Sequence, residues 1–422
     1  MNWHQIFYIL MLERWFKLNS NRDGKEYLLS LETKGIKLGL DRTKKLLNHI
    51  QNPEANILSV QIIGTNGKGS TAASLSSILE EEGLKVGLFT SPHLIDLTER
   101  IQVNRQCIDT NYIDKFINKN KSNINSIGCT FFEVLTAMAI MYFHTKAVDI
   151  AILETGLGGK YDSVTACKPA LQLFTSISMD HMNILGCSIE EITTQKASAM
   201  QFKTPCISVQ QEHSIKTILN DYAKKNHTTI EYINSSQKHY NNLSIRGIHQ
   251  TDNINLAVAG AKQLYDISTK TINEGIKKIF WPGRTQILHS QPTVIFDVAH
   301  NDDSLLSLCD YIKSIEGHNH KILLLSIQKT KQLAKALDAI KLNFDTIICT
   351  QLNDRMYTTN ELYSKLSPFA DLRCHESADT AIETMMQLSN NNNLLVIAGS
   401  HYWGKHIESN FKFFLVNNII KS

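Results

Sequence analysis

The chain has 422 residues, more than one compact core usually contains, so two domains are expected. Its 43 basic and 40 acidic residues leave a net charge of +3, which gives no electrostatic reason to expect a nucleic-acid partner. None of the eight cysteines has C-x-x-C spacing, which excludes the common zinc and redox motifs and makes a reducing cytoplasm the simplest compartment.

The first predicted element is an apolar run at 6–12. It is too short to span a membrane and has no basic region before it, so we expect neither a signal peptide nor a membrane partner. An amphipathic helix packed on the body of the protein is the simplest interpretation. A helix lying on a membrane surface is the alternative.

Short apolar runs then alternate with helix-like segments along the chain. The runs are rich in β-branched residues and often apolar on both faces, which is typical of strands inside parallel sheets. Strands are predicted at 57–63, 85–89, 148–153, 170–177, 293–298, 321–327, 345–350 and 393–399. Helical spacing of apolar residues predicts helices at 131–146, 253–265 and 302–314. This alternation predicts an α/β protein with doubly wound, mostly parallel sheets.

A domain boundary is expected where Pro and Gly interrupt the pattern at 280–292. A fresh series of strands and helices begins at Thr293. We therefore expect an N-terminal domain at 1–285 and a smaller, Rossmann-like α/β domain at 286–422.

The stretch QIIGTNGKGSTAASL at 61–75 predicts a strand, a glycine-rich turn and a helix. Its glycines would let the backbone approach an anion closely, and the helix N-terminus would aim N–H groups at phosphates. Lys68 adds a charge, and Ser70 or Thr71 adds a hydroxyl. The usual phosphate-loop pattern is not met, because Ile62 stands where it has Gly and Gly69 follows the lysine. A plain strand-to-helix turn is the alternative.

Most of the further polar clusters come just past the carboxyl ends of predicted strands, at the edge where ligands bind in open α/β sheets. They lie at 88–104, 152–166, 176–186, 193–200, 249–261, 281–288 and 296–302. Glu154 and His181 are residue types that suit Mg²⁺ beside a triphosphate, although a capping or core role is the alternative for His181. Arg284 suits phosphate because its fork binds two oxygens and its charge is permanent.

These clusters, with GIKLGLDR at 35–42 and GSHYWG at 399–404, resemble in order the motifs of the folylpolyglutamate synthase/dihydrofolate synthase family of the Mur-ligase superfamily. The phosphate loop of that family, G-T-N-G-K-G-[ST], matches 64–70. The resemblance implies a P-loop, Mur-ligase-like N-terminal domain that binds ATP and a pteroate or folate. It also implies a C-terminal domain that closes over the nucleotide and helps to bring L-glutamate.

The resemblance also implies roles for individual residues. It implies catalytic roles for Lys68, His181 and Lys196, with Lys196 carbamylated. Two Mg²⁺ ions would be held by Ser91, Glu154 and His181, and a monovalent cation is a further cofactor to consider. The implied ATP-binding residues are Asn66, Gly67, Lys68, Gly69, Ser70, Asn255, Arg284, Asp297 and His300. The implied substrate-binding residues beside the pterin are Phe132, Lys160 and Asp162.

Several positions depart from the family pattern. Gln195 stands before Lys196 where the family usually has Glu, Lys160 where it commonly has Arg, and Val298 where it usually has Gly. The Asp-Lys-Asp stretch of the C-terminal domain appears as 329–331, Lys-Thr-Lys, to which we assign no role.

The function expected from the resemblance is an ATP-dependent ligase, a monomer in the cytoplasm, that adds L-glutamate to dihydropteroate and to folates through an acyl phosphate. A Mur-type peptidoglycan ligase is the nearest rival enzyme, but SPHL with ERI at 91–101 and FFE at 131–133 favour the folate branch. A degenerate nucleotide-binding protein without ligase activity is a second alternative, supported by the departures. A P-loop kinase or simple ATPase lacks an acceptor motif.

Overall fold

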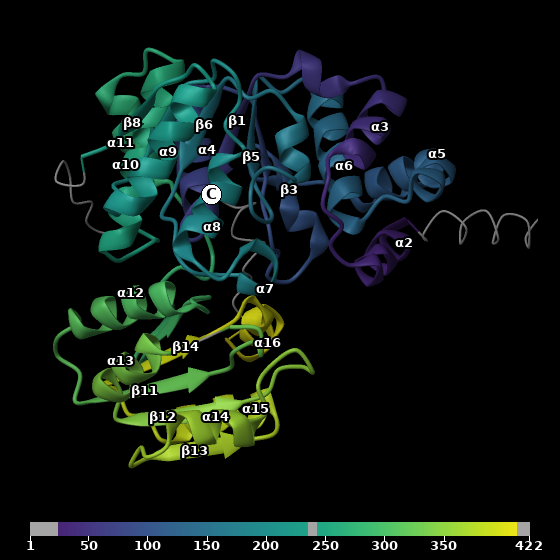
Figure 1. The fold of residues 1–422 in the computed structure, drawn as a ribbon. Helices are drawn as coiled ribbons and strands as arrows, with labels where there is room; N and C mark the ends of the chain where they lie inside the picture. The colour runs from purple at the N-terminus through teal and green to yellow at the C-terminus, as the bar shows by residue number, and fades with distance from the viewer. Residues whose placement is uncertain (1–23, 235–242, 332, 412–422) are drawn as a thin grey trace, which may run out of the picture.

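The fold is given by a computed structural model that describes residues 24–234, 243–331 and 333–411. It has two α/β domains, each built on one mostly parallel sheet with helices on both faces (Figure 1). This confirms the predicted fold class. The predicted helix at 6–12 lies outside the described residues. No helix in the described part of the chain combines the length and apolarity needed to cross a bilayer.

The N-terminal domain contains an eight-stranded sheet in the order β4-β3-β2-β5-β1-β6-β7-β8. The strands are β1 (Ser59–Ile63), β2 (Val86–Phe89), β3 (Ile101–Val103), β4 (Gln106–Cys107), β5 (Ile150–Glu154), β6 (Leu171–Phe174), β7 (Cys206–Ser208) and β8 (Ile230–Tyr232). β2, β5, β1, β6, β7 and β8 are parallel, whereas β3 and β4 form an antiparallel edge. β1 lies between β5 and β6: the chain runs from β1 to β2 and β5 on one side and then crosses to β6 on the other. This is the switch point where ligands bind in open sheets.

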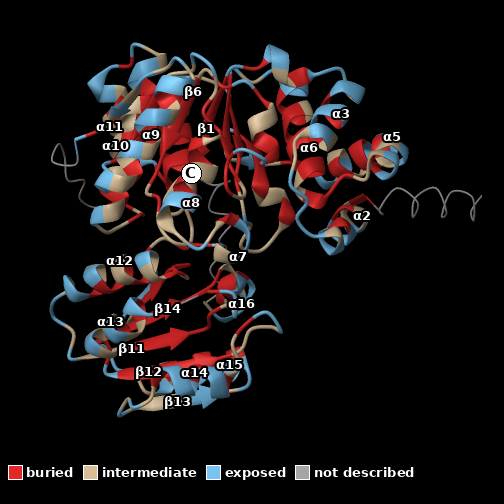
Figure 2. Cartoon of the chain, in the orientation of Figure 1, coloured by how far each residue is buried: buried red, intermediate tan, exposed pale blue. Residues whose placement is uncertain are grey.

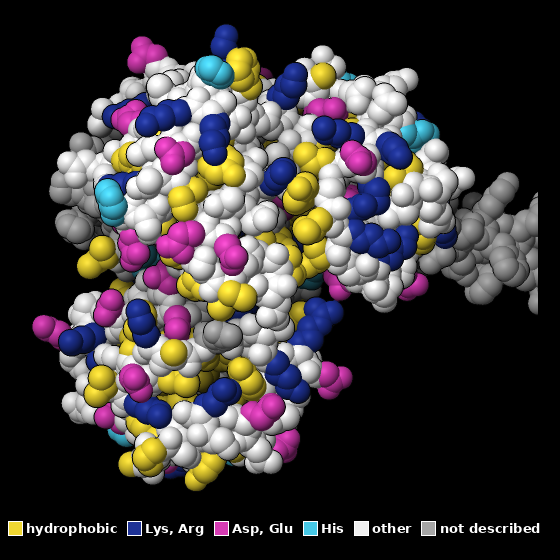
Figure 3. All heavy atoms as spheres, viewed as in Figure 1, with side chains coloured by type: hydrophobic (Ala, Val, Ile, Leu, Met, Phe, Trp, Pro, Cys, Tyr) yellow, Lys and Arg dark blue, Asp and Glu magenta, His cyan; other side chains and the backbone are white. Residues whose placement is uncertain are grey.

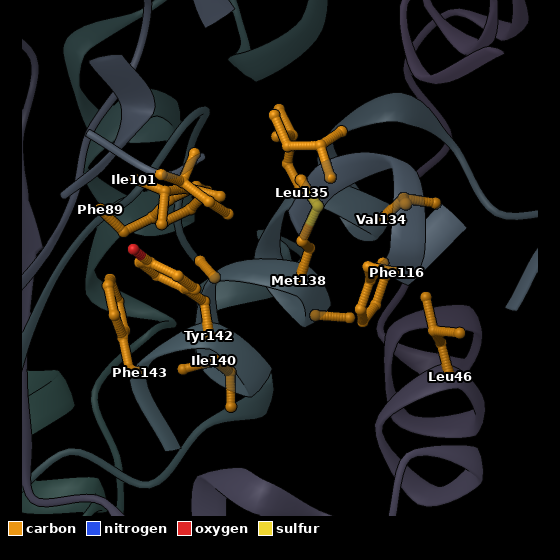
Figure 4. Packing of buried hydrophobic residues seen from close by; sticks show 14 of the residues in the cluster. Leu46, Phe89, Ile101, Phe116, Val134, Leu135, Met138, Ile140, Tyr142 and Phe143 are labelled. Atoms are coloured by element: carbon orange, nitrogen blue, oxygen red, sulfur yellow. The ribbon is translucent and has the colours of Figure 1, made fainter. Parts of the chain in front are cut away.

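Helices bury both faces of this sheet. They are α2 (Gly24–Ser30), α3 (Asp41–His49), α4 (Lys68–Glu81), α5 (Thr110–Ile127), α6 (Phe131–Thr145), α7 (Met182–Leu185), α8 (Ile189–Ala197), α9 (His213–Lys225), α10 (Ile248–Leu264) and α11 (Thr269–Lys277). Figure 4 shows one core, where Tyr142 and Phe143 of α6 lie beside Phe89 of β2. Figure 2 shows the central strands buried throughout, as expected of strands covered on both faces.

The C-terminal domain contains a six-stranded sheet in the order β13-β12-β11-β14-β10-β9. The strands are β9 (Gln286–Ser290), β10 (Thr293–Phe296), β11 (His320–Leu325), β12 (Thr346–Thr350), β13 (Leu372–His375) and β14 (Asn393–Ala398). Its helices are α12 (Asp302–Lys313), α13 (Lys335–Asn343), α14 (Thr359–Leu366), α15 (Ala378–Gln387) and α16 (Gly404–Phe411). Only β9, at one edge, runs antiparallel to its neighbour. β9 begins at Gln286, the first residue of the expected C-terminal domain.

All eight predicted strands are present, and the predicted helices appear as α6, α10 and α12. Six strands were not predicted: β3, β4, β7, β8, β9 and β13. They are short, or they alternate between buried and exposed residues, as in β9, and several lie at a sheet edge. A continuous apolar run, which was the signal used, marks only strands buried on both faces.

The two domains face each other across a cavity of about 1290 Å³. Figure 1 shows α7 and α16 at this junction, and Figure 3 shows two lobes with both signs of charge spread over each. At one point of contact, Gly404 of α16 lies against Leu94, which follows β2. A Cβ atom added at Gly404 would collide with the Leu94 carbonyl group. The domains therefore approach each other as closely as backbone allows there.

Candidate active site

The phosphate loop lies at the carboxyl end of β1 and leads into α4. Gly67 has φ +86°, a left-handed conformation that favours glycine, and a Cβ there would collide with the Asn253 side chain of α10. Lys68 begins α4, and its Nζ donates to the carbonyl oxygens of Gly64 at 3.2 Å and Thr65 at 3.1 Å. The ammonium group is thus held above the loop, where it can meet phosphate oxygens.

Two hydroxyl groups in the first turn of α4 are buried without a hydrogen-bond partner among the described residues. They are Ser70 Oγ and Thr71 Oγ1. Buried polar groups of folded proteins are normally paired, so unpaired oxygens at a helix N-terminus fit a site that is completed by a ligand. This is the arrangement expected of a triphosphate with its cation.

Glu154 ends β5, directly beside the phosphate loop. Its Oε2 accepts a hydrogen bond of 3.0 Å from the N–H of Ser91, which follows β2. Burial raises the pKa of this carboxyl group, while Lys68 and the Ser91 hydrogen bond oppose the rise. A carboxylate in this position gains stability from a nearby cation.

His181 follows β6 on the opposite side of β1, in a left-handed conformation with φ 50°. Burial lowers the pKa of its imidazole to about 4, assisted by the charges of Lys331, Lys68 and Lys196 against an opposing effect of Asp180. The imidazole is therefore neutral near pH 7, the form that can bind a metal ion.

The residues present fit Mg²⁺ better than a metal held by protein alone. No group of three or more His, Cys, Asp or Glu side chains is close enough to hold an ion within the described ranges. Glu154, His181 and the Ser91 hydroxyl instead offer one oxygen or nitrogen each around the loop. Mg²⁺ commonly takes one or two protein ligands and completes its shell with phosphates and water.

Lys196 lies in α8, and its side chain reaches the same loop. Only 4% of the residue is exposed, and its Nζ donates to the Gly64 carbonyl oxygen at 2.6 Å. Burial and the charge of Lys68 together lower the pKa of the ammonium group to about 7, against the opposing effects of Asp180 and Asp162. A substantial fraction is therefore neutral near pH 7, which a nucleophilic amine requires.

The C-terminal domain contributes the other wall of the site. Asp297 directly follows β10, and its carboxylate accepts hydrogen bonds of 2.7 Å from the N–H groups of Thr285 and Ala299. These bonds hold the segment that carries Arg284, whose Nη1 donates to the Gly283 carbonyl oxygen at 3.0 Å. His300 follows β10, and burial lowers the pKa of its imidazole to about 4.

The end of the cavity away from the phosphate loop is partly apolar. Phe132 of α6 stacks near Phe89 at 5.5 Å between ring centroids and lies against Gly156. Asp162 accepts hydrogen bonds from the N–H groups of Leu157 at 2.8 Å and Val164 at 3.0 Å. It therefore shapes the loop after β5 as well as lining the cavity.

Most of the predicted site residues line this one cavity. They are Asn66, Gly67, Lys68, Gly69, Ser70, Ser91, Phe132, Glu154, Asp162, His181, Lys196, Arg284, Asp297 and His300. Lys160 and Asn255 do not line it. Lys160 instead places its ammonium 5.0 Å from the ring centroid of Tyr161. Asn253 of α10, two positions before Asn255, lines the cavity beside Gly67.

Asn253 and Lys331 were missed by sequence reasoning. The spacing of the two asparagines on one helix could have separated them, because positions two apart point about 200° away from each other. Lys331 gave no such signal. Its side chain meets Asp180, 151 residues away in the chain.

Comparison with known proteins places this architecture in a family. The Mur ligase middle domain matches residues 62–275, and the Mur ligase glutamate ligase domain matches residues 283–401. The dihydrofolate synthase/folylpolyglutamate synthase of Bacillus subtilis is 29% identical over 90% of this chain and 96% of its own length. The protein of the same name from Buchnera aphidicola subsp. Schizaphis graminum is 32% identical, covering 72% of this chain and 76% of its own. E. coli FolC, solved in complex with DHPP and ADP, is 26% identical with a TM-score of 0.82 and covers 94% of this chain and 98% of that chain.

Proposed function

Because this chain is an ATP-dependent ligase that belongs to the dihydrofolate synthase/folylpolyglutamate synthase family of Mur ligases, we propose that it joins L-glutamate to both dihydropteroate and folates. One observation carries the proposal. A single cavity joins the phosphate loop at Lys68 to the aromatic side chain of Phe132, so a triphosphate and a pterin-bearing carboxylate can meet within it.

The reaction begins with transfer of the γ-phosphoryl group of ATP to the carboxylate of the pterin substrate. A carboxylate is a poor electrophile, and the acyl phosphate has phosphate as its leaving group. The amine of L-glutamate then attacks the acyl carbon, forming the amide and releasing phosphate. Lys68, the N–H groups of the loop and Arg284 stabilise negative charge on the transferred group.

Mg²⁺ would supply further neutralisation of that charge when bound, and Ser91, Glu154 and His181 would hold it. We propose two ions, with a monovalent cation as an additional option. Asn66, Gly67, Gly69, Ser70, Asp297 and His300 would contact ATP. On the geometry, Asn253 is a better candidate than Asn255 for the contact from α10.

We further propose that Lys196 is carbamylated. Its neutral amine would add to the carbon of CO₂ and release one proton, which turns a buried cation into an anion. The lowered pKa of Lys196 supports this step because only the unprotonated amine reacts. A carbamate there would offset the charges of Lys68 and of the bound cation.

The remaining parts of the proposal concern organisation. We propose that residues 1–285 bind ATP and the pterin substrate, that residues 286–422 help to bind L-glutamate, and that the protein acts as a cytoplasmic monomer. The alternative of a degenerate nucleotide-binding protein has no structural support, because Lys68, Glu154, His181 and Arg284 all line the cavity.

The test is phosphate release from Mg·ATP by the purified protein with L-glutamate, with dihydropteroate or tetrahydrofolate added separately, and mass detection of products. We expect turnover to require both the pterin and L-glutamate and to give products heavier by one glutamate. Lys68→Ala should abolish it. ATP binding without turnover on either pterin would refute the proposed substrates.

A further inference from the structure

Asp180, next to His181, is contacted by two side chains of the opposite domain. Lys331 Nζ lies 2.6 Å from its Oδ1, and Asn301 Nδ2 donates to its Oδ2 at 3.0 Å. The side chains of Lys331 and Asp180 are only 4% and 8% exposed. This is a buried ion pair that crosses the domain junction at the active site.

Each partner is fixed within its own domain. Lys331 follows β11, where its N–H donates to the Gln328 carbonyl oxygen at 3.0 Å and its own carbonyl accepts from Tyr357 Oη at 3.2 Å. Asp180 Oδ1 also accepts a hydrogen bond of 2.7 Å from the N–H of His181. The same oxygen of Asp180 therefore accepts from both Lys331 and the backbone of His181, which links the ion pair to the position of His181.

Lys331 is the only lysine or arginine paired with Asp180 among the residues that the structure describes. The other charged or titratable neighbours of this carboxylate are His181 and His300, whose Nε2 atoms each lie 3.9 Å away. Removal of one partner from a buried pair leaves an uncompensated charge, which is strongly unfavourable. Opening of the junction would return both groups to water, so loss of Lys331 favours the open arrangement.

We propose that Lys331 is a positioning residue whose ion pair with Asp180 holds the C-terminal domain closed over the nucleotide and fixes His181 in place. The expected effect of Lys331 on turnover rests on the proposed ligase function, whereas its effect on domain closure does not. Sequence comparison gave Lys331 no role, because the stretch at 329–331 departs from the family pattern. The structure shows that the departure brings a cation to the junction.

The test is an inter-domain distance, measured by pulsed electron paramagnetic resonance with spin labels on Cys187 and Cys374. These cysteines are exposed, one in each domain, and Cys107→Ser removes the half-buried cysteine. The variants are Lys331→Met and Lys331→Arg, with Lys329→Met as the matched control because Lys329 is an exposed lysine of the same loop. Each is measured with and without Mg·AMPPNP.

With Mg·AMPPNP we expect Lys331→Met to lower the ratio of closed to open molecules by at least roughly tenfold. Lys331→Arg should restore much of the closed population, and Lys329→Met should match the parent protein. In steady-state assays, Lys331→Met should lower kcat far more than it changes the KM for the pterin substrate. Asp180→Asn should have little further effect in the Lys331→Met background.

Equal distance distributions for Lys331→Met and Lys329→Met would overturn the proposal. If Lys331→Met does not fold, Lys331→Gln replaces it, because glutamine also removes the charge. A parent protein without ligase turnover would refute the proposed function, but the distance measurement would still test the ion pair.

Discussion

Burial shifts two titratable side chains of the site toward their neutral forms. It lowers the pKa of Lys196 to about 7 and raises the pKa of Asp162 to about 6. Both residues are buried, and both line the cavity. Their ionisation should therefore be visible in stability as well as in activity.

Asp162 predicts a pH dependence of the free energy of unfolding. Between pH 4 and pH 6 the folded protein keeps a proton on Asp162 that the unfolded chain has lost. The free energy of unfolding should therefore fall as pH rises, by up to roughly 3 kcal/mol. In Asp162→Asn this pH dependence should disappear. At pH 7 the free energy of unfolding should also be lower by about 1–3 kcal/mol, because the side-chain N–H₂ group cannot accept a hydrogen bond from a backbone N–H as the carboxylate does.

The measurement is urea unfolding at several pH values between 4 and 7. Asp221→Asn, an exposed position in α9, serves as the control. Parallel pH profiles for the parent protein and Asp162→Asn would contradict a raised pKa at Asp162.

The carbamate proposed on Lys196 predicts that activity depends on dissolved CO₂. With bicarbonate removed, kcat should fall, and it should recover when bicarbonate is returned. Lys196→Ala should lower kcat by about 100-fold or more, and Lys196→Arg should not restore it because a guanidinium group forms no carbamate. Steady-state assays with Lys224→Ala, an exposed lysine of α9, as the control check this. Bicarbonate-independent turnover would rule out the carbamate.

At the scale of single elements, the turn from β1 into α4 determines whether a nucleotide can bind. Two glycines flank this helix in left-handed conformations, Gly67 before it and Gly83 after it. A Cβ at Gly67 would collide with Asn253, whereas nothing lies within 4 Å of a Cβ at Gly83. An alanine at Gly67 therefore adds both a steric collision and backbone strain, whereas an alanine at Gly83 adds backbone strain alone.

Gly67→Ala should lower the free energy of unfolding by about 1–3 kcal/mol and abolish ATP binding. Gly83→Ala should carry the backbone cost but bind ATP as the parent protein does. Calorimetric titration with Mg·ATP and thermal unfolding of both variants test this. ATP binding by Gly67→Ala with unchanged affinity would show that the loop is not the phosphate site.

The elements also show where sequence reasoning succeeds. β1, β5 and β14 are buried at every position, so their apolar runs identified them. β8 and β13 are partly exposed and short, so local composition did not distinguish them from loops. In α10 the helix itself was predicted, but its rotation was not. Sequence reasoning therefore named Asn255, whereas Asn253 is the asparagine of α10 that lines the cavity.

At the scale of the whole molecule, ligand binding between two domains should appear as added stability. At a nucleotide concentration 100 times Kd, Mg·ATP should add about 2.7 kcal/mol to the free energy of unfolding. Removal of Mg²⁺ with EDTA should eliminate most of that gain and all turnover. Thermal unfolding with Mg·ATP, with ATP plus EDTA, and with Mg·AMP as the control provides the measurement. An undiminished gain in EDTA would argue against a metal at Glu154 and His181.

Contacts between the two domains could not be predicted from the sequence, because they join residues that are far apart in the chain. The order of the motifs pointed to fourteen of the cavity-lining residues, and most of these lie at or just after the carboxyl end of a strand that meets the junction. The Asp180–Lys331 pair joins loops of two different sheets. No periodicity or spacing predicts that meeting, since it depends on how the domains dock.

The contact between Gly404 and Leu94 has a mechanical consequence. At this contact the hydrogen atom of Gly404 faces the Leu94 carbonyl group, and any other residue would place a Cβ atom into it. The added methyl group of Gly404→Ala should therefore keep the two domains apart. Gly404→Ala would retain the phosphate loop but stay in the open arrangement, which would make that arrangement available for direct study.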